Sequence, residues 1–144
     1  MTRITRMSQI YVVSDSKAVL EELTSALEFV TPEVSQYESA ASFYAAVRKK
    51  APSLAVVDMQ VGNIGGMAIC MDLHLEESGG RLGHVPVLML LDRRADVFLA
   101  RRSRAEGFLV KPLDSFRIAD AAKAILAGNN YEDESYRPLT IEAS

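Results

Sequence analysis

The sequence predicts an α/β fold in which a single parallel sheet is covered by helices on both faces. Short apolar segments alternate along the chain with longer segments whose apolar residues recur three and four positions apart. The first pattern is typical of buried strands and the second of amphipathic helices. No internal repeat interrupts the alternation. Strict alternation of strand and helix favours one parallel sheet with right-handed crossovers.

Five segments are expected to be strands because they are short and rich in apolar, β-branched residues. In chain order they are IYVV at 10–13, EVSQY at 33–37, SLAVV at 53–57, VPVLMLL at 85–91 and GFLV at 107–110. The third is apolar enough to be buried on both faces, as strands of parallel sheets are. It is followed directly by a charged residue, Asp58. A charge at the end of a buried strand indicates that the chain leaves the core there for a polar site.

Five helices are expected between and after these strands because their apolar residues repeat with the helical period. They span 17–29, 40–50, 67–77, 95–105 and 115–126. Ser39 and Asp114 are candidate N-caps of the second and fifth helices, Pro52 ends the second, and Gly128 closes the last. The resulting (βα)5 order predicts a flavodoxin-like, doubly wound parallel sheet with the strand order 2-1-3-4-5.

Length and composition fit one globular domain. A chain of 144 residues has room for one core, and 49% hydrophobic with 24% charged residues is ordinary for such a domain. We expect the domain to span 1–128, and 129–144 to be a polar C-terminal tail with no second domain. The net charge of −3 disfavours nucleic acid as a partner, and no apolar run reaches the roughly 18 residues of a membrane span. We therefore expect a cytoplasmic protein without membrane contact.

Three charged residues lie at the predicted carboxyl ends of strands: Asp15 after the first, Asp58 after the third and Lys111 after the fifth. In the predicted order the first and third strands are neighbours where the winding reverses, and ligands of such sheets bind beyond the carboxyl ends there. Two close carboxylates suit Mg²⁺, and a lysine suits a phosphoryl group. The set therefore fits phosphoryl transfer, with Asp58 attacking phosphorus, Asp15 holding the metal and Lys111 pairing with a phosphoryl oxygen.

These residues, in this order, resemble the receiver domains of two-component response regulators. The resemblance runs from Ser8 to Leu126 and rests on VVSDS, VVDMQVGNIGGM with Asp58 and Gly66, VPVLML, and GFLVKPLD with Lys111. It implies a signalling protein rather than an enzyme, phosphorylated on Asp58 by a sensor histidine kinase or a phosphotransfer protein. It also implies a cis Lys111–Pro112 bond, Mg²⁺ as cofactor and a signalling face on the fourth helix, fifth strand and fifth helix. The implied metal ligands are Asp15, Asp58 and the backbone carbonyl of Gln60, and the face includes Phe108, Arg101 and Arg104.

Two of the positions that depart from the family pattern bear on metal binding and switching. The family usually has two adjacent acids after the first strand, and here the first is Ser14. It usually has Thr or Ser at the end of the fourth strand, and here that residue is Leu91. A neutral hydroxyl attracts Mg²⁺ less than a carboxylate does, so weak Mg²⁺ binding is expected. Because Leu91 lacks the hydroxyl that would move toward a phosphoryl group, weak switching is expected as well.

The leading hypothesis is a stand-alone receiver domain that accepts a phosphoryl group on Asp58 and acts through protein contacts. The alternative, favoured by Ser14 and Leu91, is a pseudo-receiver that serves as a protein interaction module without phosphorylation. A flavin-binding electron carrier on the same fold is disfavoured, because Asp15 would repel a phosphate placed after the first strand. The downstream protein is unknown, and the sequence leaves a homodimer open.

Overall fold

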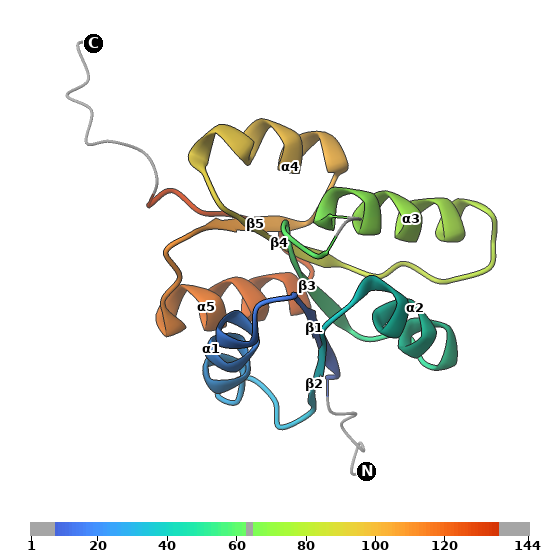
Figure 1. The fold of residues 1–144 in the computed structure, drawn as a ribbon, viewed down its shortest axis with the longest axis horizontal. Coiled ribbons are helices and arrows are strands. Elements are labelled where there is room, and N and C mark those ends of the chain that lie inside the picture. Colours follow the sequence, from blue (N-terminus) through green and yellow to red (C-terminus); the bar gives the residue numbers. More distant parts are fainter. Residues whose placement is uncertain (1–7, 63–64, 136–144) are drawn as a thin grey trace.

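A computed structural model describes residues 8–62 and 65–135 of the chain. Within these residues six strands form one sheet in the order β2-β1-β3-β4-β5-β6, and every neighbouring pair is parallel (Figure 1). The strands are β1 (Ile10–Val13), β2 (Val34–Tyr37), β3 (Leu54–Asp58), β4 (Val87–Leu91), β5 (Gly107–Val110) and β6 (Tyr131–Glu132). The predicted flavodoxin-like class and the order of the first five strands are confirmed.

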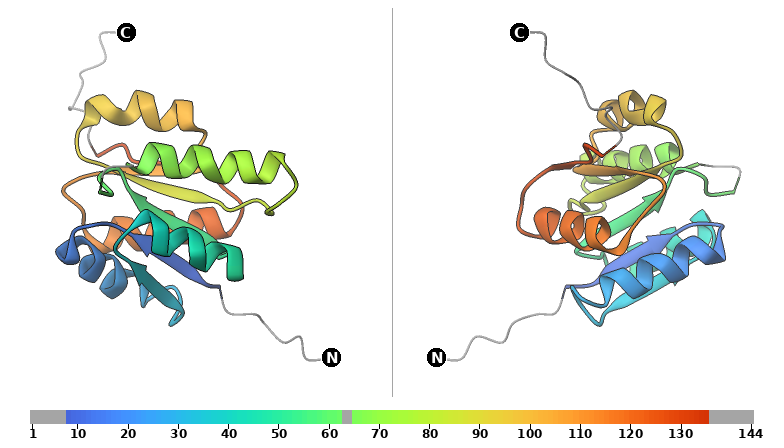
Figure 2. Two further views of the ribbon diagram at one scale, coloured as in Figure 1. Left: turned by 45° about the vertical axis from the view of Figure 1, so that its right-hand side comes forward. Right: turned by 90° about the vertical axis from the view of Figure 1, so that its left-hand side faces the viewer.

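Five α-helices of the described residues cover the two faces of the sheet. They are α1 (Lys17–Leu27), α2 (Ala40–Lys49), α3 (Gly66–Ser78), α4 (Val97–Ser103) and α5 (Ser115–Leu126). Helices α1 and α5 lie on one face and α2, α3 and α4 on the other, with the sheet between them (Figure 1), and the right-hand view of Figure 2 has α1 and α5 in front. The predicted N-caps are confirmed, because Ser39 and Asp114 each accept a hydrogen bond from an amide in the first turn. No helix in the described part of the chain has the length and apolar character needed to cross a membrane.

Alternate residues of the central strands build a core on each face. In β3, Leu54 and Val56 pack with α1 and α5, whereas Ala55 and Val57 pack with α2, α3 and α4. All four are fully buried. This two-sided burial explains the continuous apolar runs of the sequence, and it leaves the strand ends as the place for polar chemistry.

Several predicted elements differ from the observed ones by one or two residues at their ends, and two of these differences have a clear cause. The helix expected at 95–105 is shorter, because a separate 3-10 turn (Arg94–Asp96) precedes α4 and Arg104 ends it in the left-handed conformation, with φ of 62°. The strand expected at 85–91 begins only at Val87. Pro86 has no amide hydrogen for the sheet ladder, so the strand starts after it.

A sixth strand, β6, was not predicted. The segment 129–144 was expected to be a polar C-terminal tail, yet Tyr131 pairs with Gly107 on the outer edge of β5 and packs against the core beneath α1 and α5. The carboxylate of Asp133 is buried and accepts a hydrogen bond from the Val110 amide at 2.9 Å. The close approach needs the glycine, because a Cβ atom at Gly107 would lie 2.7 Å from the Tyr131 carbonyl oxygen. The strand is therefore held by polar contacts that composition does not reveal.

Candidate functional site

The register of the sheet brings four side chains together at its carboxyl edge. The pairing of β1 with β3 places Ser14 beside Asp58, since the residues just before them are partners. The pairing of β4 with β5 places Asp92 beside Lys111 in the same way. The cluster therefore lies between β1, β3, β4 and β5, at the point where the winding of the sheet reverses.

Asp58 is buried, with its side chain only 1% exposed, and both of its carboxylate oxygens are hydrogen-bonded. Its Oδ2 accepts from the Ser14 hydroxyl at 2.7 Å. Its Oδ1 accepts from the Gln60 amide at 3.2 Å and from Lys111 Nζ at 2.9 Å. A buried carboxylate is stable only when its charge is balanced and its oxygens are bonded. Both conditions hold here, so the apolar strand β3 can end on a charge.

Lys111 bridges two carboxylates rather than one. Its Nζ lies 2.9 Å from Asp58 Oδ1 and 2.8 Å from Asp92 Oδ1. Burial alone would lower the pKa of Lys111, but the hydrogen bonds from its ammonium group to Asp58 and Asp92 raise it above its usual value. Burial would raise the pKa of Asp92, but its hydrogen bond with Lys111 and the charge of that residue hold it below its usual value. Lys111 and Asp92 are therefore both charged at neutral pH.

The peptide bond that follows this lysine, Lys111–Pro112, is cis, as the resemblance implied.

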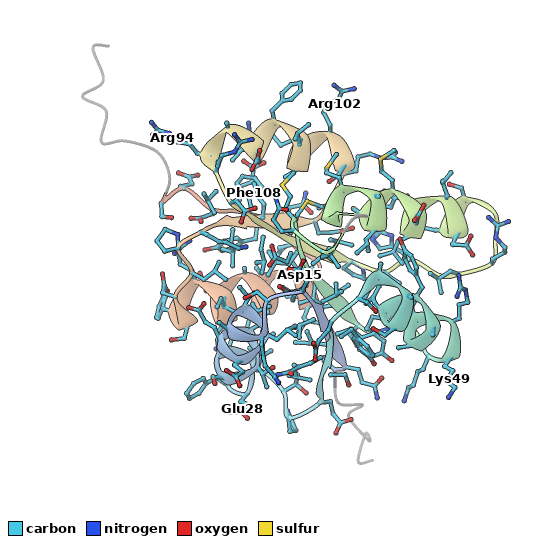
Figure 3. All side chains as sticks on the ribbon, in the orientation of Figure 1. Asp15, Glu28, Lys49, Arg94, Arg102 and Phe108 are labelled. Atoms are coloured by element: carbon cyan, nitrogen blue, oxygen red, sulfur yellow. The ribbon has the colours of Figure 1, made fainter. Side chains whose placement is uncertain are left out.

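Asp15, labelled in Figure 3, lies after β1 at the same edge, but its exposed side chain contacts a different partner. Its Oδ2 accepts from the Gly62 amide in the loop after β3, at 2.9 Å. The structure thus brings Lys111 to Asp58 but gives Asp15 a hydrogen bond to the neighbouring loop instead. Among the described residues, no three His, Cys, Asp or Glu side chains form a group that could hold a metal.

A Mg²⁺ ion needs fewer protein ligands than that, because it commonly binds one or two carboxylates and keeps water and phosphate oxygens as its other ligands. Asp15, Asp58 and the Gln60 carbonyl fit such a site by donor type, since all three offer hard oxygen atoms. At position 14, where an acid would add negative charge to the site, this chain has the hydroxyl of Ser14. This hydroxyl already donates a hydrogen bond to Asp58. The residues present therefore fit a weak Mg²⁺ site.

The residues expected to carry a signal lie at and beyond β4. Leu91 is fully buried in the core under α2, α3 and α4. Phe108 is only 3% exposed, and the Arg101 guanidinium lies over its ring, 5.9 Å from the ring centre. Arg101 also pairs with Glu132 of β6 at 2.8 Å, whereas Arg104 is exposed at the end of α4. The unpredicted strand β6 therefore contacts the face on which these residues were placed.

Sequence reasoning missed Asp92 as a member of the cluster. It follows an apolar strand directly, as Asp58 and Lys111 do, so the rule that pointed to those residues also applies to it. The ion pair between Arg117 and the buried Asp133 was missed as well. Asp133 lies in a polar segment without periodic apolar residues, and no sequence signal distinguishes it from a solvated acid.

Comparison with known proteins identifies the family. The family model of the response regulator receiver domain matches residues 10–123. The chain belongs to this family. Receiver domains are signalling modules of two-component systems that interact with histidine kinases or phosphotransfer proteins, and they generally bind Mg²⁺ at their acidic phosphorylation site. The predicted resemblance is confirmed.

Individual relatives are distant in sequence. Protein PilH of Pseudomonas aeruginosa is 25% identical over 124 residues, which cover 85% of this chain and 100% of that protein. The DNA-binding response regulator MtrA of Mycolicibacterium smegmatis is 27% identical over 139 residues, which cover 95% of this chain but 58% of MtrA.

Solved receiver structures share the fold at lower sequence identity. The isolated receiver domain of RcsB from Salmonella enterica serovar Typhimurium, determined in the presence of phosphomimetic BeF3⁻, has a TM-score of 0.73 at 15% identity, covering 91% of this chain and 96% of that one. The chemotaxis response regulator CheY4 of Vibrio cholerae has a TM-score of 0.71 at 18% identity, covering 82% of this chain and 98% of that one.

Proposed function

We propose that this chain is a stand-alone receiver that accepts a phosphoryl group on Asp58 and signals by binding other proteins. The observation that carries the proposal is the buried Asp58 carboxylate with the Lys111 ammonium group 2.9 Å away, at the reversal point of the sheet. Family membership supports a histidine kinase or phosphotransfer protein as the donor. The match to the whole of PilH supports action without an output domain. The DNA binding named for MtrA is not carried over, because the chain spans 58% of that protein.

The transfer follows from the contacts of Asp58. One of its carboxylate oxygens forms a bond to the phosphorus of a phosphohistidine donor while the P–N bond breaks. The electron pair of that bond returns to the imidazole, which leaves neutral with one proton on its ring. Ser14 and the Gln60 amide orient the carboxylate, and Lys111 pairs with a phosphoryl oxygen. Mg²⁺ held by Asp15, Asp58 and the Gln60 carbonyl supplies further positive charge when it is bound.

The proposed output is a change in protein binding on the face that contains Phe108, Arg101 and Arg104. Glu132 of β6 contacts Arg101 on this face, so a partner that docks there meets β6 as well. The partner itself is unknown. The cytoplasmic location predicted from the sequence remains part of this proposal.

A second candidate is the pseudo-receiver, an interaction module that works without phosphorylation. Two observations favour it. Ser14 donates its hydroxyl to Asp58 where the family usually supplies a second acid for the metal. Leu91 is fully buried and offers no hydroxyl to a phosphoryl group.

Intact-mass measurement after incubation with acetyl phosphate, with and without Mg²⁺, separates the two. We expect the wild-type chain to gain the mass of one phosphoryl group, faster with Mg²⁺, and Asp58→Asn to gain none. Asp120→Asn, which removes an exposed acid on α5, is the matched control and should behave as the wild type. A wild-type chain that gains no mass under either condition would favour the pseudo-receiver.

A further inference from the structure

The Lys111 ammonium group is held by two carboxylates, and only Asp58 is the proposed phosphoacceptor. Nζ lies as close to Asp92, at 2.8 Å, as to Asp58, at 2.9 Å. We propose that Asp92 is the switch residue of this site. Asp92 binds Lys111 while Asp58 is unmodified. A phosphoryl group on Asp58 binds Lys111 in place of Asp92, and the released Asp92 moves the start of α4. This inference rests on the proposed function, because it requires a phosphoryl group on Asp58.

Asp92 is placed to sense the site, whereas Leu91 is not. Leu91 is fully buried and carries no polar side-chain atom. Asp92 is one residue further along, where the pairing of β4 with β5 sets it opposite Lys111. Its side chain is 32% exposed and that of Lys111 is 23% exposed, against 1% for Asp58. Asp92 and Lys111 are therefore the members of the cluster that reach solvent and that an incoming phosphoryl group meets first.

A phosphoryl group on Asp58 competes directly with Asp92 for the ammonium group. It carries between about one and a half and two negative charges at neutral pH, whereas the Asp92 carboxylate carries one. The stronger anion attracts Lys111 more, and it also repels Asp92, which lies against the same ammonium group. The position of Asp92 beside Lys111 is thus less favourable in the modified state than in the unmodified one. Only such a difference between states can shift a conformational equilibrium.

The residues after Asp92 can transmit its displacement because they form a closed turn. The backbone amide of Arg93 donates to Asp96 Oδ2 at 3.3 Å, and the Arg93 guanidinium donates to Asp96 Oδ1 at 3.1 Å. Asp96 is buried and directly precedes α4. A movement of Asp92 therefore acts on a compact unit at the start of α4 rather than on an open loop. The switch works by repelling a carboxylate, in place of the attraction of a hydroxyl that Leu91 cannot provide.

Asp92→Asn tests the inference, because it keeps the shape of the side chain and removes its charge. Asp92→Ala removes the polar end of the side chain altogether. Asp120→Asn is the control, because it removes a similar charge from an exposed site on α5. Each protein is titrated with BeF3⁻ in the presence of Mg²⁺ while the backbone amides of 93–97 are followed by NMR. In the wild type and in Asp120→Asn, we expect these amides to shift on binding. In both Asp92 variants, we expect them to start near their bound positions, to shift little further, and to report binding at least about 5-fold tighter.

The outcomes separate this inference from the function on which it rests. If Asp92→Asn and Asp92→Ala bind BeF3⁻ with wild-type affinity and show the full wild-type shift at 93–97, Asp92 is not the switch, although the site still functions. If the wild type binds but its amides at 93–97 do not move, the inference is also overturned. A lack of binding by all four proteins would overturn the proposed function and this inference together.

Discussion

The two least exposed aspartates in the described part of the molecule are each paired with a cation, but the two cations are held in different ways. Asp58 at the end of β3 and Asp133 after β6 are each 1% exposed. Each accepts a hydrogen bond from a backbone amide, Asp58 from Gln60 and Asp133 from Val110. Burial and charge balance are therefore alike, and neither of them distinguishes a reactive site from a structural one.

The cations differ in how firmly they are bound. The Arg117 guanidinium pairs with Asp133 and Asp114 and also donates to the Pro112 carbonyl oxygen, so its planar fork is fixed from several sides. The Lys111 ammonium group is a single point charge between Asp58 and Asp92, at the solvent edge. An ammonium group shared by two carboxylates can move to a third anion, whereas a guanidinium group bound on several sides to fixed acceptors cannot. The exchangeable cation thus lies at the site that we propose to accept a phosphoryl group.

The largest expected effect is on stability. We expect Asp133→Ala to lower the free energy of unfolding by about 2 to 4 kcal/mol, because it leaves the buried Val110 amide without its acceptor and takes one of its anionic partners from the half-buried Arg117. Asp58→Ala should cost only about 1 to 2 kcal/mol, because Lys111 keeps Asp92. Urea unfolding of both variants measures the difference. Equal losses, or a larger loss for Asp58→Ala, would remove the proposed distinction between the two aspartates.

The fork itself is tested by Arg117→Lys, which keeps the charge and removes the planar geometry. We expect a loss of about 1.5 to 3 kcal/mol, the range for hydrogen bonds to charged groups, together with faster hydrogen exchange at the Val110 amide. Urea unfolding measures the loss of stability, and NMR measures the rate of hydrogen exchange at the Val110 amide. Wild-type stability in this variant would mean that charge alone holds β6.

The proposed Mg²⁺ site provides the next test, at the Ser14 side of Asp58. Ser14→Asp adds a carboxylate beside Asp58 and should raise the affinity for Mg²⁺ by roughly 10-fold, because a second acid attracts the ion more strongly than a hydroxyl. Calorimetric titration measures it, with Ser39→Asp on the distant α2 cap as a control for added charge. Equal Mg²⁺ affinities of Ser14→Asp and the wild type would place residue 14 outside the metal shell.

The smallest expected effect concerns a third cation between two acids, on the surface. His84 lies 2.8 Å from Glu77 and 2.5 Å from Glu106, and its hydrogen bond with Glu77, followed by that with Glu106, raises the pKa of His84 despite partial burial. A raised pKa stabilises the fold fully below the unfolded value of about 6.5, and this contribution is lost as the pH rises through the folded pKa. The side chain is 43% exposed, so solvent screening limits the effect to about 0.5 kcal/mol.

The check on this effect is the difference in unfolding free energy between the wild type and His84→Gln. It should be larger below about pH 6 than above about pH 8. A difference that does not change with pH would show that the two glutamates bind His84 without favouring its charged form.

Much of this arrangement could be predicted from the sequence. The alternation of strand-like and helix-like apolar patterns predicted the strand order. That order placed Asp15, Asp58 and Lys111 at one edge of the sheet. The contact between Lys111 and Asp58 follows from that placement.

The rest depends on contacts that apolar patterns do not encode. Strand β6 is held by Asp133 and Arg117, two polar residues that are 16 positions apart in the chain. The direction of the Asp15 side chain depends on the backbone of the loop that presents the Gly62 amide. The role of Asp92 depends on which carboxylates share one lysine, and strand order alone does not specify side-chain pairing.

The central claim, that the aspartate with the exchangeable cation is the phosphoacceptor, is tested most directly by locating the modified residue. After reaction with acetyl phosphate and Mg²⁺, borohydride reduction converts an aspartyl phosphate to homoserine, which peptide mass spectrometry locates. We predict homoserine at position 58 and none at positions 15, 92 or 133. Homoserine at position 92 or 133, or its absence from position 58 in a chain that has gained phosphoryl mass, would contradict the claim.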